Sequence, residues 1–463
     1  MPAVFLIDFG STFTKIVAVD PAAPRVLARV QAPSTVDTDV RVGLDAALGE
    51  LRTALGTPAV AAGRFMASSS AAGGLRLAAL GLVPELTAEA ARRAALGAGA
   101  RVLRVFAHRL NSREAAALEA LAPEIVLLAG GTDGGNSEVV RHNAAALART
   151  SLTCPIVYAG NKDATDEVEA LLRAGGKDVV VTENVLPEIG RLNVEPVRDA
   201  VRELFMRRIV EAKGMHRVRP MVGDVLMPTP MAVLLAAVLL AHGVPGEAGV
   251  GDVVVVDVGG ATTDVHSAAS GTPSDPTWVV RGLPEPFAKR TVEGDLGLRV
   301  NAGSVLEAAG GERLASLASL PAARVTTMVA QLARETERVP TTRDEHALDE
   351  ALARTAVSIA VGRHAGTVET VYGIAATPVQ VVRGKDLTRV GVVVGTGGIF
   401  AHGAAPRRVL EGALVDATSP FSLRPRDARL LVDRSYLLYA MGLLAGDDPR
   451  AALRLMKRHL VDA

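Results

Sequence analysis

The sequence predicts an α/β protein organised around two related strand–turn–strand hairpins that stand far apart along the chain. Residues 6–20 read LIDFGSTFTKIVAVD, and residues 255–268 read VVDVGGATTDVHSA. In each, an apolar strand leads to Asp, one residue, Gly and a short turn with hydroxyl side chains, after which strand-type residues resume. Between the hairpins, at 124–182, strand-like runs alternate with amphipathic stretches of helical length, which favours parallel βαβ units.

Length and composition set outer bounds on the fold and on its partners. The chain has 463 residues, enough for about two to four domains of roughly 100–200 residues. Hydrophobic residues make up 49% and aromatic residues only 3%, so the cores must consist mostly of Ala, Val and Leu. The 50 basic and 50 acidic residues cancel, so we expect neither nucleic acid nor a membrane as a partner.

The single cysteine and the apolar runs indicate the compartment. Cys154 cannot form a disulfide within the chain, and the nine histidines show no zinc-type spacing. The first residues lack the basic start and apolar core of a secretory signal. The longest apolar run, 231–241, spans about 11 residues, whereas a bilayer needs roughly 20. We therefore expect a cytoplasmic protein and leave open whether it forms a homo-oligomer.

The elements expected in the first half follow from hydrophobic periodicity. Before residue 70 we expect a βββαβ order, and after residue 124 a βαβαβ order followed by a strong helix. The expected strands are the two arms of the hairpin within 3–20, then 25–30, 64–69, 124–130, 155–160 and 178–182. The expected helices are 42–56, 137–150, 163–174 and 195–213.

The second half repeats the hairpin and ends in helices. The expected elements are a helix at 231–242, the hairpin within 252–268, a long helix at 347–372, strands at 379–383 and 389–394, and helices at 433–445 and 449–460. No low-complexity linker separates them, so the domains are expected to interleave. The predicted domains are a first lobe (1–110), an α/β insertion or extension of it (111–220), a connecting helix (221–250), a second lobe (251–432) and C-terminal helices returning to the first lobe (433–463).

Both hairpins carry residue types that bind phosphate. Glycine lets a backbone approach phosphate oxygens closely, successive turn N–H groups form an anion-binding concavity, and hydroxyl groups add donors. The matching positions are the aspartates Asp8 and Asp257, the glycines Gly10 and Gly259, and Thr12 and Thr14 with the region of Thr262 and Thr263. One copy alone would be explained as a plain β-hairpin with a glycine turn. Two copies with Asp at the same offset favour a phosphate clamp.

The carboxylates of these hairpins predict a metal contact, because a carboxylate repels phosphate. Their expected role is to hold Mg²⁺, partly through water, or to orient an attacking water. We assign Asp8 and Asp264 to catalysis, and Asp8, Asp257 and Asp264 to the metal. Lys15 would neutralise charge on a terminal phosphate.

A third Gly-rich loop, GTGG at 395–398, follows a predicted strand. Without bulky side chains, a flat base and ribose can lie against such a backbone. The motif alone is weak evidence, but its place after the second hairpin and before a closing helix strengthens it. The expected nucleotide-binding residues are Gly10, Ser11, Thr12, Thr14, Lys15, Asp257, Gly259, Gly260, Thr262, Thr263, Gly395, Thr396, Gly397 and Gly398.

The order of these motifs resembles the actin/sugar-kinase/heat-shock-chaperone superfamily. By that resemblance the hairpins are the phosphate-1 and phosphate-2 motifs, GTGG is the adenosine motif, and helices 231–242 and 433–445 are the connecting helices. The resemblance implies an α/β fold of two ribonuclease-H-like lobes that close over ATP and Mg²⁺. The 124–182 stretch exceeds what that core needs and implies an extra α/β insertion in the first half.

Longer strings narrow the resemblance to MutL-type proteins associated with glutamate mutase, which are unrelated to the mismatch-repair protein of the same name. The similar strings, from residue 4 to about 445, are FLIDFGSTFTK, LLAGGTDGGN, YAGNKDA, ENVLPEIGRLNVEPVR, VVDVGGATTDVHS, VEGDLGLR and VVVGTGGIF. This family is encoded with adenosylcobalamin-dependent aminomutases. The resemblance implies an ATP-binding and ATP-hydrolysing chaperone or reactivating factor, with ATP or ADP and an adenosylcobalamin-dependent mutase as its partners.

Two segments each allow two interpretations. The loop AGGTDGGN at 129–136 follows a strand, where open α/β sheets bind ligands, so Asp133 and Asn136 indicate either a ligand or partner site or a tight structural turn. In TVEGDLGLR at 291–299, Glu293 and Asp295 either face the nucleotide or cap the next helix.

Other functions of the same fold stay open as alternatives to an ATPase. A small-molecule kinase would need a substrate held near the terminal phosphate, and no sugar- or acetate-binding signature is recognisable. A nucleotide-dependent scaffold or assembly protein would need hydrolysis only incidentally. The activators of radical dehydratases hold an iron–sulfur cluster with two cysteines per chain, and Cys154 is the only cysteine here.

Overall fold

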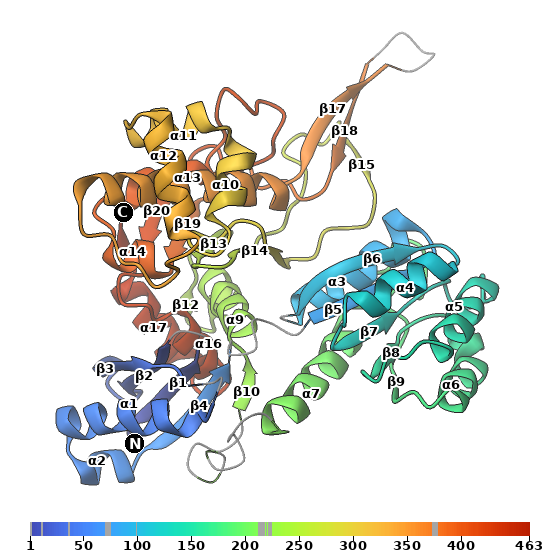
Figure 1. The fold of residues 1–463 in the computed structure, drawn as a ribbon, viewed down its shortest axis with the longest axis horizontal. Coiled ribbons are helices and arrows are strands. Elements are labelled where there is room, and N and C mark those ends of the chain that lie inside the picture. The colour runs from blue at the N-terminus through green and yellow to red at the C-terminus, as the bar shows by residue number, and fades with distance from the viewer. Residues whose placement is uncertain are drawn as a thin grey trace. The chain divides into compact units, whose positions relative to one another are not determined.

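The computed structural model describes residues 2–10, 13–35, 38–69, 76–98, 100–211, 218, 220, 225–372 and 378–463. The chain forms two compact units (Figure 1). The first comprises Met1–Ala232 with Gly282–Pro284, and the second comprises Val233–Arg281 with Glu285–Ala463. Ser11 and Thr12, two of the predicted nucleotide-binding residues, lie outside the described residues.

The first lobe is a five-stranded sheet in the order β10-β4-β1-β2-β3. Its strands are β1 (Val4–Phe9), β2 (Phe13–Asp20), β3 (Arg25–Pro33), β4 (Arg64–Ser69) and β10 (Val225–Pro228). Strand β2 pairs antiparallel with both β1 and β3, whereas β4 pairs parallel with β1 and β10 pairs parallel with β4. Helix α1 (Val40–Leu55) begins at the side-chain cap of Asp39 and buries Leu44, Leu48 and Leu51 in the core, and α2 (Thr57–Ala61) follows it.

The insertion of the first unit is a parallel sheet in the order β6-β5-β7-β8-β9. Its strands are β5 (Arg76–Gly81), β6 (Arg101–Ala107), β7 (Ile125–Leu128), β8 (Ile156–Tyr158) and β9 (Val179–Val181). Its helices are α3 (Glu89–Gly97), α4 (Ser112–Ala120), α5 (Glu138–Ala148), α6 (Thr165–Ala174) and α7 (Glu195–Glu211), with single turns at Pro84–Ala88 and Lys162–Ala164.

Alternate residues of β7 enter two different cores, which shows that both faces of the insertion sheet are covered. Leu127 packs in the core shared with α3 and α7, and Val126 packs with α4, α5 and α6. The three strands and two helices predicted between 124 and 182 are confirmed. Two strands that precede residue 111, β5 and β6, also hydrogen-bond in this sheet.

The second lobe repeats the strand order of the first in the sheet β16-β14-β13-β19-β20-β21. Its strands are β13 (Val253–Val258), β14 (Thr263–Ala268), β16 (Ala288–Glu293), β19 (Val392–Thr396), β20 (Arg429–Val432) and β21 (Val461–Asp462). Strands β13, β14 and β16 are antiparallel, and β19 and β20 run parallel to β13. Two sheets of one order confirm the predicted pair of ribonuclease-H-like lobes.

Helices and a small sheet complete the second unit. Its remaining helices are α10 (Ala302–Ala309), α11 (Gly311–Ala318), α12 (Ala322–Leu332), α13 (Arg343–His364), α14 (Gly398–His402), α15 (Pro406–Leu410), α16 (Leu438–Ala445) and α17 (Pro449–His459), with a single turn at Glu411–Ala413. A small sheet of β15 (Val279–Arg281), β18 (Val379–Arg383) and β17 (Thr367–Val371) extends away from the lobe (Figure 1). Strands β11 (Gly243–Val244) and β12 (Glu247–Ala248) pair with each other.

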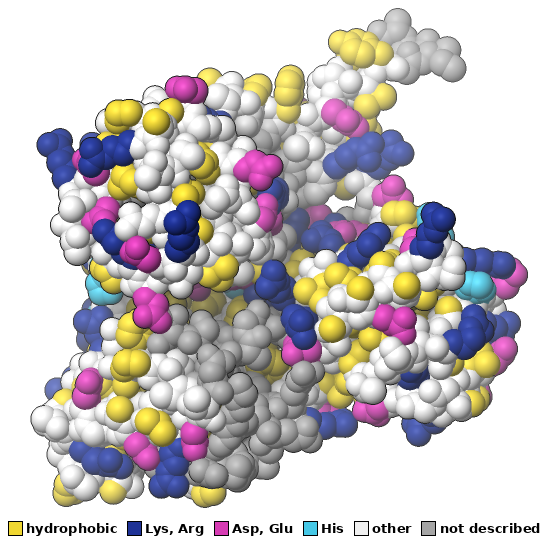
Figure 2. All heavy atoms as spheres, in the orientation of Figure 1, with side chains coloured by type: hydrophobic (Ala, Val, Ile, Leu, Met, Phe, Trp, Pro, Cys, Tyr) yellow, Lys and Arg dark blue, Asp and Glu magenta, His cyan; other side chains and the backbone are white. Residues whose placement is uncertain are grey.

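Helix α9 (Thr229–His242) carries the chain from the first unit into the second. Among the described residues, no helix is both long enough and apolar enough to cross a membrane. On the face that Figure 2 shows, basic and acidic side chains are interspersed on each unit, in keeping with the zero net charge.

Two helix expectations are wrong in their length, and one of them, the helix expected at 433–445, begins only at Leu438. The helix expected at 347–372 ends at His364, and Thr367–Val371 forms strand β17 instead. The change follows Gly366, after which the β-branched residues Thr367, Val368, Thr370 and Val371 favour a strand. In the sequence, the small residues at 351–361 suggest one uninterrupted helix that continues to residue 372.

Candidate functional site: two glycine turns and a third loop

The first hairpin closes through a backbone hydrogen bond across its turn. The N–H of Gly10 donates to the carbonyl of Phe13 at 3.1 Å, and Asp8 pairs across the strands with Lys15. A Cβ atom on Gly10 would lie 2.6 Å from that same carbonyl oxygen, so no larger residue fits without displacing the turn. Thr14 is fully buried one position before Lys15.

Asp8 is a buried carboxylate at the end of β1. Its Oδ1 accepts a hydrogen bond of 2.6 Å from the hydroxyl of Thr229, the first residue of α9, and its Oδ2 lies 4.0 Å from Nζ of Lys15. Burial raises the pKa of Asp8, although the charge of Lys15 and the bond from Thr229 act in the opposite direction. The hairpin is therefore tied directly to the first turn of the connecting helix.

The second hairpin repeats the strand register and the turn-closing hydrogen bond of the first. The N–H of Gly259 donates to the carbonyl of Thr262 at 2.9 Å, and Asp257 pairs across the strands with Asp264. Superposing the two registers matches the following pairs: Asp8 with Asp257, Gly10 with Gly259, Phe13 with Thr262, Thr14 with Thr263 and Lys15 with Asp264. Lys15 thus occupies in the first hairpin the place that Asp264 occupies in the second.

Asp264 lies in an ion pair that sequence reasoning did not anticipate. Its Oδ1 accepts hydrogen bonds from Nε of Arg290 at 3.1 Å and from Nη2 at 2.7 Å, and its Oδ2 lies 3.4 Å from the hydroxyl of Thr262. Arg290 is on β16 and is buried. Thr263 turns its own hydroxyl to the carbonyl of Leu296 at 2.6 Å.

The segment after β16 holds the second turn in place. The N–H of Arg299 and that of Val300 donate to the carbonyl of Gly260, and Nδ2 of Asn301 donates to the carbonyl of Ala261 at 2.7 Å. Among the described residues, the N–H groups of Gly260 and Ala261 have no acceptor. The turn's carbonyls are engaged and its N–H groups are left for an anion.

The two acids of this segment bind a helix end. Nη1 of Arg363, near the end of α13, donates to Glu293 at 2.7 Å and to Asp295 at 2.8 Å. Hydrogen bonds from Arg363 lower the pKa of Asp295. Asn301, and neither acid, stands at the start of α10, so the capping alternative for Glu293 and Asp295 is wrong.

The GTGG loop packs directly on the second hairpin. Thr396 pairs with Asp257 across β19 and β13, and a Cβ on Gly397 would lie 2.4 Å from the carbonyl oxygen of Val258. Gly397 has φ of 107°, which side chains disfavour. A Cβ on Gly395 would meet the ring of Phe400, and Gly398 is exposed at the start of α14. The structure therefore brings Asp257 and the predicted GTGG residues together.

Asp433 links this loop to the second connecting helix. It accepts hydrogen bonds from the N–H groups of Leu437 and Leu438 at the start of α16, and from the hydroxyl of Thr396 at 3.2 Å. Burial raises the pKa of this carboxyl, which the hydrogen bonds oppose. As with Asp8 and α9, a buried carboxylate joins a motif to a connecting helix.

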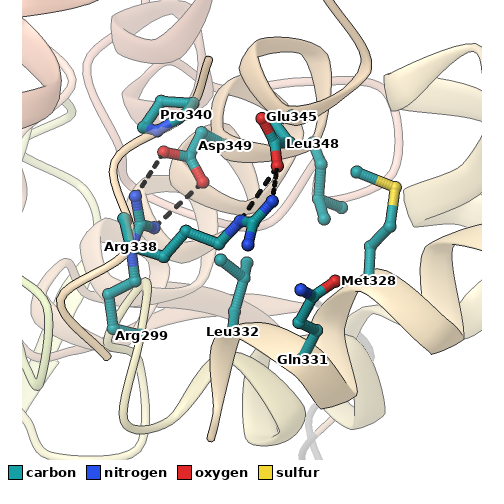
Figure 3. A pocket seen from close by; sticks show the side chains of 9 residues that line it. All are labelled: Arg299, Met328, Gln331, Leu332, Arg338, Pro340, Glu345, Leu348 and Asp349. Carbon is teal, nitrogen blue, oxygen red and sulfur yellow. Dashed lines mark hydrogen bonds and ion pairs between the residues drawn. The ribbon is translucent and has the colours of Figure 1, made fainter. Parts of the chain in front are cut away.

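A small cavity of about 40 Å³ lies beside the second turn (Figure 3). Two ion pairs border it: Arg299 with Asp349 at 2.6 Å, and Arg338 with Glu345. Its lining residues are Arg299, Met328, Gln331, Leu332, Arg338, Pro340, Glu345, Leu348 and Asp349. Since the backbone of Arg299 binds Gly260, the pair with Asp349 connects the turn to α13.

The polar side chains of the insertion loop hold the loop itself. Asp133 Oδ1 accepts hydrogen bonds from the N–H of Lys162 at 3.0 Å and from Nδ2 of Asn184 at 2.8 Å. Asn136 Oδ1 accepts one from the N–H of Val139 at the start of α5. These contacts favour the structural-turn alternative over a ligand site.

The donor set fits a metal that is bound together with a nucleotide. Among the described residues, no three His, Cys, Asp or Glu side chains gather as a metal site. Mg²⁺ needs only one or two carboxylates when phosphates and waters complete its octahedron, and Asp257 and Asp264 face each other across one strand pair. The N–H groups of Gly260 and Ala261, which have no acceptor among the described residues, fit phosphate in the same way.

The repeated lobe order and the repeated glycine turn define the class: this is an actin/sugar-kinase/heat-shock-chaperone ATPase fold. A family model described as MutL protein matches residues 4–460. Protein MutL of Clostridium tetanomorphum is 47% identical over 464 residues, with 100% of both chains covered. The chain belongs to the MutL protein family, and the resemblance seen in its motifs is confirmed.

Solved structures give more distant similarities. A nucleotide-free acetone carboxylase is 14% identical with a TM-score of 0.38, covering 96% of this chain and 70% of that one. The activator of 2-hydroxyisocaproyl-CoA dehydratase from Clostridium difficile with bound ADPNP is 10% identical with a TM-score of 0.31, covering 98% and 97%. Because these TM-scores are low, the assignment of the fold rests on the strand order described above.

Proposed function

We propose that the chain binds and hydrolyses ATP with Mg²⁺, and that it does so as a chaperone or reactivating factor for an adenosylcobalamin-dependent mutase. The observation that supports ATP binding and hydrolysis is the repeated turn. In both lobes an Asp is the penultimate residue of the central strand, and a Gly N–H closes the turn onto the carbonyl three residues later. The second of these turns offers to phosphate the N–H groups of Gly260 and Ala261, which are unbonded within the described part of the chain.

The residues of the hairpins take different parts in this proposal. Gly259, Gly260 and Ala261 supply the second turn's backbone to phosphate, and Lys15 balances phosphate charge from the first hairpin. Asp257 and Asp264 hold Mg²⁺ or its waters, and Asp264 orients the attacking water. Mg²⁺, when bound with ATP, supplies charge neutralisation for phosphoryl transfer to water.

Asp8 takes a different part, since it is buried and bonded to Thr229. We propose that it reports the state of the first hairpin to α9 and reaches the metal through water. Loss of the terminal phosphate removes a ligand that favours one arrangement of the hairpins. A ligand that prefers one of two states is what biases a conformational equilibrium.

The client assignment is supported by family membership and by the motif strings that the chain shares with glutamate-mutase-associated proteins. The direct test mixes inactivated glutamate mutase, free adenosylcobalamin and Mg-ATP with the parent chain or with Asp264→Asn. We expect mutase activity to return only with the parent, because the variant keeps the side-chain size but lacks the carboxylate charge. Recovery that does not depend on this protein would disprove the reactivating role.

The same variant tests the ATPase half separately. Asp264→Asn should lower ATP turnover by about 10²-fold or more, the order expected when a group that stabilises the transition state is lost. ATP binding should be largely retained, which equilibrium dialysis would measure. Asp252→Asn is the matched control, because Asp252 lies at the other end of β13 and bonds Ser270. Equal turnover of parent and Asp264→Asn would place the chemistry elsewhere.

A further inference from the structure

The ion pair between Arg290 and Asp264 lies where the proposed metal would have to bind. Arg290 has a side chain that is only 3% exposed, and Asp264 has one that is 14% exposed. Two guanidinium nitrogens donate to the same oxygen, Oδ1. A buried arginine so placed fixes both the orientation of the carboxylate and its electrostatic potential.

The strand register explains why an arginine is required at this position. Asp257 and Asp264 are directly paired, so their side chains project from the same face of the sheet as neighbours. Two carboxylates at such a spacing repel each other, and the repulsion grows as water is excluded. Arg290 sits on the same face, because β16 pairs Val292 with Asp264 and Arg290 with His266. Its charge offsets the repulsion without a bound metal.

His266 completes the environment of the arginine. The ring is fully buried, and neither ring nitrogen has a hydrogen-bond partner among the described residues. His266 pairs with Arg290 across β14 and β16, so the ring and the guanidinium are neighbours on this face of the sheet. The guanidinium points at Asp264, because two of its nitrogens donate to Oδ1.

We propose that Arg290 is a positioning residue that holds Asp264 ready and competes with Mg²⁺ for its Oδ1. This inference rests on the proposed function, since it concerns the carboxylate to which that function assigns the metal. In the structure, two nitrogens of the arginine donate to Oδ1. Metal binding requires that this bond be weakened or exchanged, so Arg290 lowers the metal affinity while it keeps the carboxylate in its working orientation.

The test compares metal affinity with turnover in Arg290→Gln. Binding of Mn²⁺ with ADP, followed by electron paramagnetic resonance at pH 8, should tighten by about tenfold or more, which corresponds to 1.4 kcal/mol. ATP turnover at saturating Mg²⁺ should fall, because Asp264 is no longer oriented. A purely structural arginine would lower both affinity and turnover, so the opposite directions of the two changes identify the role.

Two further variants keep the outcome decisive. Arg290→Lys retains the charge without the two-point geometry and should keep the metal affinity near that of the parent while turnover falls. Arg424→Gln removes an equally buried arginine of the same unit, bonded to Ser358 and Gly412, and should lower thermal stability without tightening metal binding. Arg290→Gln could fail to fold. In that case Arg290→Lys decides the question: it retains the positive charge, so tighter metal binding by this variant would disprove the competition.

The inference and the proposed function fail in different ways. If the parent binds Mn²⁺ with ADP and the folded Arg290→Gln binds it equally or more weakly, Arg290 does not compete with the metal and the inference is overturned while nucleotide binding stands. If the parent itself binds neither ADP nor Mn²⁺ with ADP, the proposed function falls and the inference falls with it.

Discussion

At the scale of single residues, carboxylates that look equivalent in the sequence have different physical surroundings. Asp8 and Asp264 were both assigned to catalysis and metal binding. Asp8 is buried and accepts a bond from a threonine hydroxyl, whereas Asp264 is partly accessible and ion-paired with an arginine. A neutral hydroxyl donor and a guanidinium donor constrain a carboxylate differently, so the two positions should respond differently to metal.

Asp8 should make the stability of the chain pH-dependent. Because its folded pKa lies above the ordinary value of 3.8, the parent loses stability as the pH rises from 3.8 through that raised pKa. Asp8→Asn removes this titration and keeps an oxygen for the bond from Thr229. The variant should therefore gain stability relative to the parent across the same pH window. Urea unfolding of both proteins at a series of pH values measures the difference, and a difference that is constant with pH would contradict the burial argument.

At the scale of elements, the two glycine turns are held from outside by segments that the sequence does not mark as part of the site. The strand–turn–strand pattern is local, so the sequence alone predicted each hairpin correctly. The brace at 294–301, the α9 contact through Thr229 and the α16 contact through Asp433 come from elements distant in sequence. In TVEGDLGLR, the residue types single out Glu293 and Asp295 as candidates. In the structure it is Gly297 and the backbone of the segment that contact the turn.

Gly297 should be essential to the shape of the second turn. A Cβ at this position would lie 2.3 Å from the carbonyl carbon of Ala261, a distance that requires backbone movement. Gly297→Ala should cost about 1–3 kcal/mol of stability and weaken ATP binding, because the turn is displaced. Gly303→Ala is the matched control on α10, where a Cβ meets nothing within 4 Å and the helix should gain up to about 1 kcal/mol. Chemical denaturation and ATP titration of both variants test this, and unchanged binding by Gly297→Ala would show that the brace is dispensable.

At the scale of the whole molecule, one lobe plan is used twice and a parallel sheet is added to the first unit. The two lobe sheets share their strand order, which is why the two glycine turns fall at equivalent places. The added sheet has its own core on α4, α5 and α6. Its loops are held by Asp133, Asn161 and Asn184 through bonds within the insertion.

Asp133 should therefore stabilise the insertion without taking part in ATP turnover. Asp133→Ala leaves the amide of Asn184 and the N–H of Lys162 without their acceptor, which should cost about 1–3 kcal/mol. Hydrogen exchange of the amides of β7 and β8 should speed up, while ATP turnover stays at the parental rate. Asp199→Ala, at an exposed position of α7, is the control and should change neither. A loss of turnover in Asp133→Ala would instead support the ligand-site alternative.

The sequence by itself determined the local motifs of this protein: the two hairpins, the GTGG loop, the alternating strands and helices of the insertion, and the family. These are short-range patterns of glycine, aspartate and apolar residues, whose spacing along the chain is enough to predict them. Only the tertiary structure decided which side chains meet the motifs. Thr229 lies 221 positions from Asp8, and Arg290 reaches Asp264 across neighbouring strands. Threonine, arginine and asparagine are common on protein surfaces, so nothing in their sequence context marks them, and sheet order and helix docking alone bring them to the site.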